Sequence, residues 1–242
     1  MPATGTGDQN AGSPPFSVVV PAGGSGTRMG GVRKPFLEVC GQPLLYHTIE
    51  SLQRTPGCAE VIPVLPAEEY GNAGLALQLK QRFGIDRMAL GGRTRQASAL
   101  AGLELVREDL AVVLIHDAVR PLVEPELVRR VADAAEEFGA AIAAVPVAET
   151  IKEVGMSRAI QATLPRERLW LARTPQGFRK DLILKAHYAA RDQGFCGTDD
   201  AQLVERLGVQ VRIVQDSYDN LKITTPEDLV IAEAVLSWRR QL

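Results

Sequence analysis

Residues 18–35 place a glycine-rich segment between a hydrophobic run and two cations, and this combination is typical of phosphate binding. The segment reads VVVPAGGSGTRMGGVRKP and contains five glycines, with Arg28 and Lys34 six positions apart. Backbone N–H groups can surround an anion only where side chains leave room, and glycine supplies both that room and unusual dihedral angles. Arg28 and Lys34 would add positive charge. The alternative is a glycine-rich surface loop with solvated cations.

The glycine segment fits neither of two common nucleotide-binding motifs. A dinucleotide fingerprint needs G-x-G-x-x-G and an acidic residue about 20 positions later, but here Gly24 and Gly26 are followed by Met29, with Gly30 one position late. A P-loop needs Gly-Lys-Ser/Thr at a helix start, whereas this chain has GGVRKP. The two cations suit polyphosphate chemistry instead, because they can stabilise charge on the reacting phosphorus oxygens and on a leaving pyrophosphate.

A second polar turn, HDAVRP at 116–121, directly follows the hydrophobic run 111–115. An aspartate just past a buried strand faces the ligand cleft, where Asp117 can accept hydrogen bonds from sugar hydroxyls or help to hold Mg²⁺. Arg120 can bind a phosphate through two hydrogen bonds. The structural alternative is that Asp117 caps the turn and pairs with Arg120. His116 is not needed as a general base, because a phosphate nucleophile is already ionised near neutral pH.

Two cations from later in the chain are further candidates for this cleft. Arg166 lies in RERLW, and Lys222 lies in DNLKITTPED, where a short extended piece precedes a helix start. Each would be interpreted as a solvated surface charge if it were considered alone. Asp199 and Asp200 in TDDAQ are interpreted as a helix cap with an acidic first turn.

The elements around these turns predict an α/β fold. Hydrophobic runs predict strands at 16–20, 61–65, 87–90, 111–115 and 140–145. Amphipathic spacing predicts helices at 43–55, 74–82 and 125–138, and a further helix that carries Ala99, Leu100, Leu103 and Val106. This alternation predicts a Rossmann-like, mostly parallel sheet flanked by helices, with ligands at the carboxyl edge of the strands.

The alternation breaks after Pro146. Two short strands at 149–154 and 158–164 are expected to form a protruding β-arm at about 147–172. Such an arm is commonly an oligomer contact, although the pattern fits a plain surface hairpin as well. The rest of the chain is expected to return along 170–178, followed by helices at 180–193, 199–207 and 226–238 and a strand at 209–214. We expect residues 1–15 to be a disordered leader and residues 16–242 to form a single domain.

The composition favours a soluble cytoplasmic protein without nucleic-acid or membrane partners. Hydrophobic residues make up 45% and charged residues 23% of the chain, and its net charge of −2 gives no general attraction to nucleic acid or anionic membranes. Cys40, Cys58 and Cys196 form no C-x-x-C pair, which argues against a disulfide framework and a zinc site. No apolar stretch approaches the ~18 residues of a membrane span.

Seven collinear motifs from Phe16 to the C-terminus resemble the 2-C-methyl-D-erythritol 4-phosphate cytidylyltransferases of the non-mevalonate isoprenoid pathway. They are PAGGSGTRMGGVRKPFLEVCGQPLLYHTIESL, GGRTRQASALAGL, HDAVRPLV, ETIKEV, RERLWLARTPQGF, TDDAQLVE and DNLKITTPEDLVIAE. The resemblance implies a nucleotidyltransferase domain that transfers CMP from CTP to the phosphate of methylerythritol phosphate, with Mg²⁺ as cofactor. The products would be 4-CDP-2-C-methyl-D-erythritol and pyrophosphate.

The same resemblance implies roles for individual residues. Arg28 and Lys34 would be catalytic and would stabilise the pentacoordinate phosphorus. The residues implied to bind CTP are Ala22, Gly23, Gly24, Ser25, Gly26, Gly92, Arg93, Ser98 and Asp117. The residues implied to bind the acceptor, a sugar-alcohol phosphate, are Arg120, Thr150, Arg166, Thr174 and Lys222. The resemblance also implies a homodimer that exchanges the β-arm, so that Thr150 and Arg166 would serve the partner's site. No protein ligand to the metal is assigned.

Three alternatives remain open from the sequence. Ribitol 5-phosphate cytidylyltransferases are similar in the glycine, H-D-x-x-R-P and T-D motifs, and a few pocket residues decide the acceptor. A nicotinamide-dependent oxidoreductase is a more distant alternative, which the misplaced third glycine and the missing ribose acid disfavour. The third alternative is a nucleotide-binding regulatory module without catalysis, in which Arg28 and Lys34 would be dispensable for activity.

Overall fold

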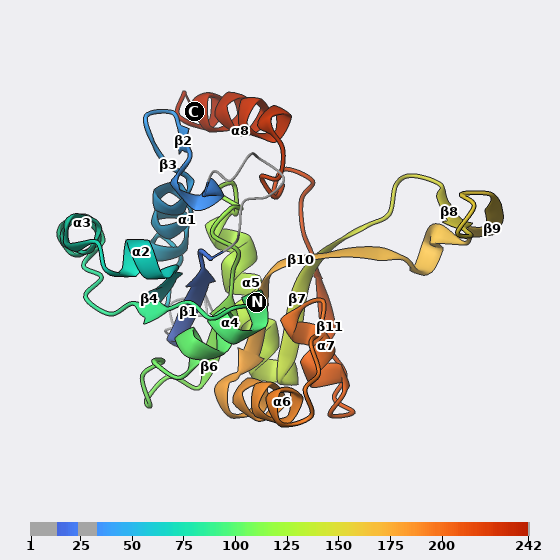
Figure 1. Cartoon of the computed structure of the whole chain (residues 1–242), viewed down its shortest axis with the longest axis horizontal. Coiled ribbons are helices and arrows are strands. Elements are labelled where there is room, and N and C mark those ends of the chain that lie inside the picture. Colours follow the sequence, from blue (N-terminus) through green and yellow to red (C-terminus); the bar gives the residue numbers. More distant parts are fainter. Residues whose placement is uncertain (1–13, 24–32, 242) are drawn as a thin grey trace, which may run out of the picture.

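The computed structural model describes residues 14–23 and 33–241, and a seven-stranded sheet with helices on both faces forms its centre (Figure 1). The strands are β1 (Phe16–Pro21), β4 (Cys58–Leu65), β5 (Ala89–Leu90), β6 (Val112–Ile115), β7 (Ala140–Pro146), β10 (Trp170–Arg179) and β11 (Arg212–Gln215). They lie in the order β11-β7-β10-β6-β1-β4-β5. Neighbouring strands are parallel except at β10, which is antiparallel to β6 and β7. The predicted mostly parallel sheet is therefore confirmed.

Some of the predicted features fall outside the described residues. These are residues 1–13 of the expected leader and the loop residues Gly24, Ser25, Gly26 and Arg28. Pro14 and Pro15 precede β1 without regular secondary structure.

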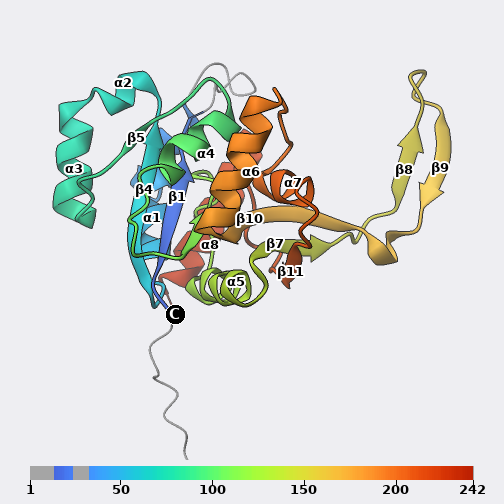
Figure 2. The ribbon, with the colours of Figure 1, turned by 90° about the horizontal axis from the view of Figure 1, so that it is seen from below.

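Helices cover both faces of the sheet, as Figure 2 shows with α4 and α6 on one side and α5 on the other. The helices are α1 (Leu44–Gln53), α2 (Ala67–Tyr70), α3 (Ala73–Phe83), α4 (Arg95–Leu103), α5 (Pro125–Phe138), α6 (Lys180–Asp192), α7 (Asp200–Glu205) and α8 (Pro226–Arg239). Near the top of Figure 1, α8 packs against a small hairpin of β2 (Glu38–Val39) and β3 (Gln42–Pro43). None of the described helices is long and apolar enough to cross a membrane.

The central strand β1 contributes to the core on both faces of the sheet. Val18 and Val20 pack in the cluster that contains α1, α3 and α5, and Val19 packs in the cluster with α4, α6 and α7. Successive side chains of a strand point to opposite faces, so a strand buried on both faces is a continuous hydrophobic run. On the second face, α4 approaches closely because Gly102 has no side chain: a Cβ there would clash with Val19 and lie 2.8 Å from Val64 Cγ2.

Most predicted elements are present with small shifts at their ends. Helix α5 spans the predicted residues 125–138, opening with Pro125 and ending before Gly139, whose φ is +88°. The hairpin of β2 and β3, helix α2 and the direction of β10 were not predicted. Helix α2 is only four residues long, which is too short for a periodic pattern, and the antiparallel direction of β10 depends on long-range pairing.

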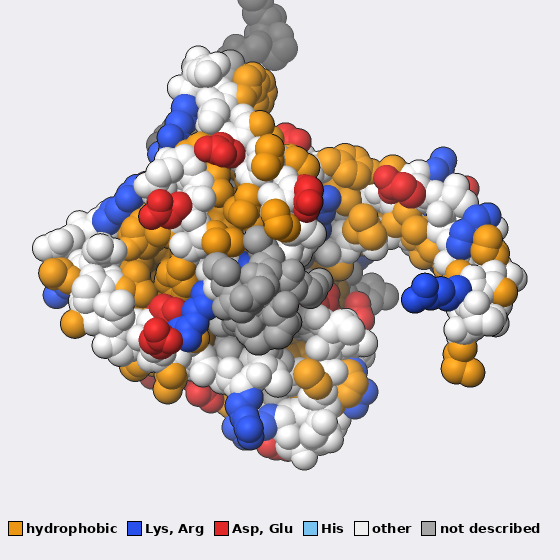
Figure 3. Space-filling model, turned by 45° about the horizontal axis from the view of Figure 1, so that its top comes forward, with side chains coloured by type: hydrophobic (Ala, Val, Ile, Leu, Met, Phe, Trp, Pro, Cys, Tyr) orange, Lys and Arg blue, Asp and Glu red, His pale blue; other side chains and the backbone are white. Residues whose placement is uncertain are grey.

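The predicted β-arm is present as a two-stranded antiparallel sheet. Strands β8 (Ile151–Val154) and β9 (Ile160–Leu164) pair through Ile151 and Leu164, and the arm projects to the right of Figure 1. A 3-10 turn at Arg166–Arg168 leads back to β10, whose first residues pair with the end of β7. Figure 3 shows the arm as a projection that stands apart from the rest of the molecule.

The parallel strands deliver their polar turns to one edge of the sheet. Backbone hydrogen bonds continue past the strand ends: the N–H of Ala22 donates to Val64 O (2.9 Å), that of Gly91 to Leu65 O (2.7 Å), and that of His116 to Val19 O (2.9 Å). These bonds hold the loops after β1, β5 and β6 next to one another. The antiparallel strand β10 pairs Gln176 with Ile115 and so brings Thr174 to the same edge.

Candidate active site

The turn after β5 forms a small cradle at the N-terminus of α4. Thr94 caps this helix by accepting from the N–H of Ala97 (3.0 Å), and the buried Ser98 Oγ accepts from the N–H of Gly92 (3.1 Å). A Cβ at Gly92 would lie 2.5 Å from that of Ala97, so this position has room only for glycine. A Cβ at Gly23 would contact Ser98 Oγ at 3.6 Å. The structure therefore places the end of β1 opposite this turn.

Four of the residues implied to bind CTP thus lie together: Ala22, Gly23, Gly92 and Ser98. Arg93 lies in the same turn with an exposed side chain. The hydroxyl of Ser98 also donates to Thr94 O (2.9 Å). Ser98 therefore shapes the turn, in which Gly92 is exposed.

Asp117 is the charged centre of the edge. It directly follows β6, and its side chain is only 10% exposed. Its Oδ1 accepts from Arg95 Nε (3.0 Å), and its Oδ2 accepts from Lys222 Nζ (2.7 Å). Burial alone would raise the pKa of Asp117, but the positive charges of Arg95, Lys222 and Arg120 hold that pKa far below its usual value. Asp117 is therefore ionised at neutral pH, and its main partners are Arg95 and Lys222.

Arg120 lies beside Asp117 with one donor left over. Its Nη1 donates to Asn220 O (2.8 Å), and its Nε lies 3.9 Å from Asp117 Oδ2, beyond hydrogen-bond distance. Among the described residues this buried Nε has no hydrogen-bond partner. A buried donor without a partner is unfavourable, so Arg120 is suited to a bound anion. The simple pair with Asp117, the structural alternative, is the weakest contact of the cluster.

Thr174 and His116 hold the backbone of Asp117 in place. Thr174 Oγ1 accepts from the N–H of Asp117 (3.1 Å) and lies 3.1 Å from His116 Nδ1, while His116 Nε2 lies 3.2 Å from Arg120 O. A carbonyl can only accept, so Nε2 carries the proton and Thr174 donates to Nδ1. Burial lowers the pKa of His116 to about 4. The neutral histidine therefore orients the Thr174 hydroxyl and the turn that carries Asp117.

Lys34 contacts the distant segment of the chain that carries Lys222. Lys34 begins a short 3-10 turn (Lys34–Phe36), and its Nζ donates to Thr224 O (3.0 Å). Lys222 lies two residues earlier in the same segment, which the N–H of Ile223 attaches to Val119 O (2.9 Å). The structure therefore joins the last residue of the predicted catalytic loop to the segment that carries Lys222.

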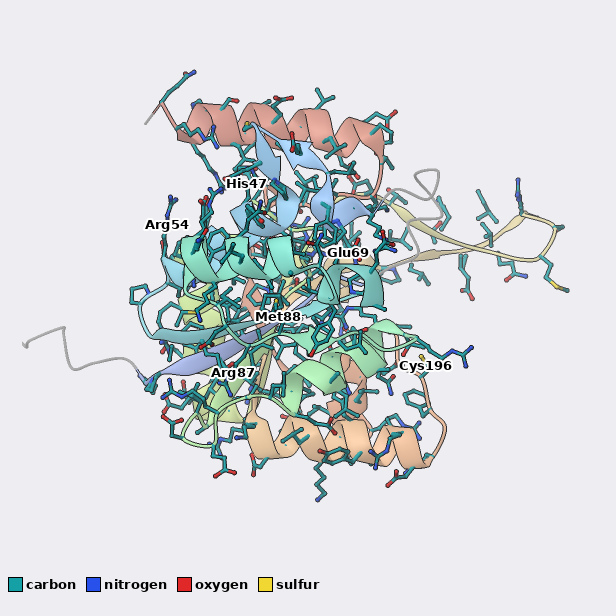
Figure 4. All side chains as sticks on the ribbon, turned by 60° about the vertical axis from the view of Figure 1, so that its left-hand side comes forward. His47, Arg54, Glu69, Arg87, Met88 and Cys196 are labelled. Atoms are coloured by element: carbon teal, nitrogen blue, oxygen red, sulfur yellow. The ribbon has the colours of Figure 1, made fainter. Side chains whose placement is uncertain are left out.

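Ion pairs with α2 hold the chain just before Lys34. Arg33 pairs with Glu68 (2.7 Å) and with Glu69, which is labelled in Figure 4. The unpredicted helix α2 thus has a clear position in the site: it follows β4 at the carboxyl edge and anchors the end of the glycine loop.

Thr150 and Arg166 are not brought to this cluster. Thr150 is exposed directly before β8, and Arg166 lies in the turn after β9, where it donates to Ala148 O. Both therefore belong to the arm of β8 and β9, which Figure 1 shows projecting away from the central sheet.

Arg95 and Asn220 are site residues that the sequence analysis missed. Arg95 supplies the closest contact to Asp117 Oδ1. Asn220 Nδ2 donates to Thr174 O (2.9 Å) and to Asp216 Oδ2 (2.8 Å), while its carbonyl accepts from Arg120. The position of Arg95 directly after a glycine turn could have indicated from the sequence that it is a site residue. Nothing in the sequence around Asn220 indicated its burial.

The described residues contain no cluster of three or more His, Cys, Asp or Glu side chains that could hold a metal ion.

Cations around a buried carboxylate at the carboxyl edge of a parallel sheet are suited to a highly charged phosphate ester, and the fold is that of an α/β nucleotidyltransferase. Comparison with known proteins specifies the class further. Residues 16–238 match the family model of 2-C-methyl-D-erythritol 4-phosphate cytidylyltransferase. The chain belongs to this family, and it is a cytidylyltransferase.

Individual relatives agree with this assignment. The chain is 45% identical over 228 residues to the 2-C-methyl-D-erythritol 4-phosphate cytidylyltransferase of Syntrophus aciditrophicus, covering 92% of this chain and 96% of the relative. The corresponding protein of Pelotomaculum thermopropionicum is 43% identical, with 93% and 95% covered.

Solved structures extend the agreement to the fold. The crystal structure of the Thermus thermophilus cytidylyltransferase has a TM-score of 0.76 and 38% identity, with 91% of this chain and 98% of that chain covered. A 4-diphosphocytidyl-2C-methyl-D-erythritol synthase from Anaerococcus prevotii has a TM-score of 0.82 and 29% identity, with 93% and 97% covered. These relatives give no support to the alternative of a nicotinamide-dependent oxidoreductase.

Proposed function

We propose that this chain transfers CMP from CTP to the phosphate of 2-C-methyl-D-erythritol 4-phosphate, releasing pyrophosphate, as the names of its relatives indicate. The observation that carries the proposal is that Lys222 and Arg120 lie beside the buried Asp117 at the carboxyl edge of the sheet, while Lys34 binds the segment that carries Lys222. A reaction between two phosphates needs positive charge at their meeting point, and this edge supplies it.

In the reaction, an oxygen of the acceptor phosphate attacks the α-phosphorus of CTP. A new P–O bond forms, and the bond from the α-phosphorus to the bridging oxygen breaks, so that pyrophosphate leaves with the electron pair. The acceptor phosphate is largely ionised near neutral pH, because the second pKa of such a group is about 6. No protein base is required. Lys34 and Arg28 stabilise the negative charge that grows on the phosphorus oxygens and on pyrophosphate.

The nucleotide lies along the loops after β1 and β5 in this proposal. Gly24, Ser25 and Gly26 hold the triphosphate. Ala22, Gly23, Gly92, Arg93 and Ser98 surround the cytosine. Asp117 faces the ribose, since an ionised carboxylate has about four acceptor sites and two of them remain after Arg95 and Lys222 have bound.

The acceptor lies on the side of Lys222 and Arg120. The free Nε of Arg120 and the ammonium of Lys222 bind its phosphate, while Thr174 assists from β10. Because the Thr174 hydroxyl donates to His116, it is left as an acceptor for a hydroxyl of the sugar alcohol.

Replacing Lys222 with alanine is expected to raise the KM for methylerythritol phosphate by about tenfold, with a smaller change in the KM for CTP. Losing a charge-assisted hydrogen bond is equivalent to about 1.5 kcal/mol or more. Steady-state kinetics with each substrate varied in turn measure this split. A loss confined to CTP binding would contradict the assignment of Lys222 to the acceptor.

Mg²⁺ is proposed as the cofactor. Mg²⁺ usually keeps several waters and binds through one or two carboxylates together with substrate phosphates, which fits a site where few carboxylates are offered. Asp117 is the described carboxylate in position to contribute. When bound, the ion would supply charge neutralisation on the triphosphate. Chelation by EDTA should abolish turnover and added Mg²⁺ should restore it.

A homodimer through the β-arm is proposed as the functional form. Three apolar residues of the arm, Val154, Met156 and Ile160, have relative solvent exposures of 52–106%. Apolar side chains exposed in this way are unfavourable on an arm that nothing covers. An arm laid over a second copy would bury these side chains and carry Thr150 and Arg166 to the partner's site. Sedimentation velocity should give twice the monomer mass, and replacing residues 152–163 with a short Gly-Ser turn should give the monomer.

The proposed reaction is tested by measuring pyrophosphate release from CTP with methylerythritol phosphate and, separately, with ribitol 5-phosphate. We expect the kcat/KM for methylerythritol phosphate to be the larger of the two. Faster turnover of ribitol 5-phosphate would identify the alternative acceptor. CTP binding without turnover of either acceptor would instead indicate a regulatory module.

A further inference from the structure

Arg95 joins two buried carboxylates that the sequence analysis did not connect. It is the first residue of α4, and its Nε donates to Asp117 Oδ1 (3.0 Å) while its Nη1 donates to Asp200 Oδ2 (2.6 Å). The side chain of Asp117 is 10% exposed and that of Asp200 is 1% exposed. A planar guanidinium can serve two carboxylates in fixed directions, whereas the single ammonium of lysine cannot reproduce this geometry.

Other contacts fix the position of Asp200, which binds Arg95. His187 Nε2 lies 3.2 Å from its other oxygen, and Gln176 Oε1 accepts from its backbone N–H (3.1 Å). Burial alone would raise the pKa of Asp200, but Arg95 and His187 lower it below its usual value. Asp200 is therefore an ionised, immobile partner for Arg95. The interpretation of TDDAQ as a helix cap is correct for Asp199, which caps α7, and incomplete for Asp200.

Each carboxylate oxygen of Asp117 binds a different cation, one on the proposed nucleotide side of the site and one on the proposed acceptor side. Arg95 takes Oδ1 and Lys222 takes Oδ2. Arg95 also begins the helix whose preceding turn contains Gly92. The orientation of the Asp117 carboxylate therefore depends on Arg95, which lies on the proposed nucleotide side of the site. That orientation in turn determines where Lys222 lies on the proposed acceptor side.

We propose that Arg95, held by Asp200 and His187, is a positioning residue for CMP transfer, which aligns Asp117 and, through it, Lys222. The proposal rests on the proposed function. It is distinct from a structural role, in which Arg95 would only neutralise two buried charges. In that case its loss would lower stability and leave the kinetics of the folded fraction unchanged.

The test is a double-mutant cycle between Arg95→Lys and Asp117→Asn, with kcat, both KM values, the Kd for CTP and the Tm measured for each variant. Arg95→Lys alone is expected to lower kcat/KM about 10- to 100-fold, the range typical of losing a supporting hydrogen-bond partner. In the Asp117→Asn background the same change should lower kcat/KM less than threefold, because Arg95 acts through that carboxylate. Asp200→Asn releases Arg95 without removing it, so it should reproduce the defect and can replace Arg95→Lys if that variant does not fold.

The matched control is Arg107→Lys, which alters an exposed pair with Asp109 before β6, at the opposite edge of the sheet. Its kinetics should equal those of the wild type. The proposal is overturned if Arg95→Lys matches this control, or if its effect is fully retained in the Asp117→Asn background. Failure of the proposed function would be visible separately, as absent turnover by the wild type. The cycle would then be evaluated from the Kd for CTP, where the same non-additivity is expected.

Discussion

Replacing Lys34 with alanine is expected to lower kcat about a hundredfold or more and to change the KM for CTP much less. A donor aimed at charge that develops in the transition state typically contributes about 3 kcal/mol to lowering the barrier. The contact of Lys34 with Thr224 O places its ammonium beside the segment of Lys222 before any substrate binds. Arg28→Ala is expected to behave in the same way, since the resemblance assigns both cations to the same phosphorus.

The measurement for Lys34 is steady-state kinetics with Tm recorded in parallel. Lys185→Ala, which removes an exposed lysine of α6, is the matched control and should leave kcat unchanged. Kinetic constants for Lys34→Ala equal to those of the wild type would contradict a catalytic role. A rise in KM alone, with kcat retained, would reduce Lys34 to a substrate-binding residue.

Asp117→Ala has the second large expected effect, and this one combines activity with stability. The substitution leaves Arg95, Lys222 and Arg120 together without the carboxylate that neutralises them. Removing one member of a buried charge cluster typically lowers the free energy of unfolding by about 3 kcal/mol or more. Urea denaturation at pH 7 measures the change, and kcat/KM for CMP transfer should fall further than in Arg95→Lys.

The difference in the free energy of unfolding between the wild type and Asp117→Ala should depend on pH in a defined direction. The pKa of Asp117 is depressed in the folded protein, so its contribution is complete above the ordinary aspartate pKa of about 4 and is lost as the pH falls toward the folded value. The difference between wild type and Asp117→Ala should therefore be constant from pH 5 to 7 and shrink below about pH 4. Asp109→Ala, an exposed control, should change the free energy of unfolding far less than Asp117→Ala does, because solvent screens an exposed ion pair. An equally small change for Asp117→Ala would refute the charge cluster.

The sequence predicts the position of Asp117 well because that prediction depends only on local structure. A continuous hydrophobic run ending in His-Asp indicates a buried strand and a polar turn at its carboxyl end, and β6 with its turn confirms both. The turn at Gly92 is predictable for the same reason, since it precedes an amphipathic helix. In both cases strand, turn and side chain lie within a few residues of one another.

The partners of these residues were not predictable because they come from distant parts of the chain. Lys34 and Thr224 meet only because α8 and its preceding segment return to β2 and β3. Thr174 reaches the turn of Asp117 only because β10 inserts antiparallel between β6 and β7. No local pattern encodes that insertion, and Arg95 and Asp200 were therefore recognised as a pair only in the folded chain.

For the β-arm, the sequence predicts the local hairpin but not the function of the hairpin in an assembly. Alternation around Gly155 indicates a hairpin, and β8 and β9 form it. The proposed action of Thr150 and Arg166 on the partner's site depends on a second copy of the chain. Within one chain, both residues lie on the arm, as the proposed exchange requires.

A crystal structure of the protein with CTP and Mg²⁺ tests the central claim most directly. The account predicts the α-phosphate within hydrogen-bond distance of Lys34 and Arg28, the cytosine against the turn of Gly92, and the ribose beside Asp117. A nucleotide bound away from the carboxyl edge of the sheet, or with its α-phosphate out of reach of both Lys34 and Arg28, would contradict it.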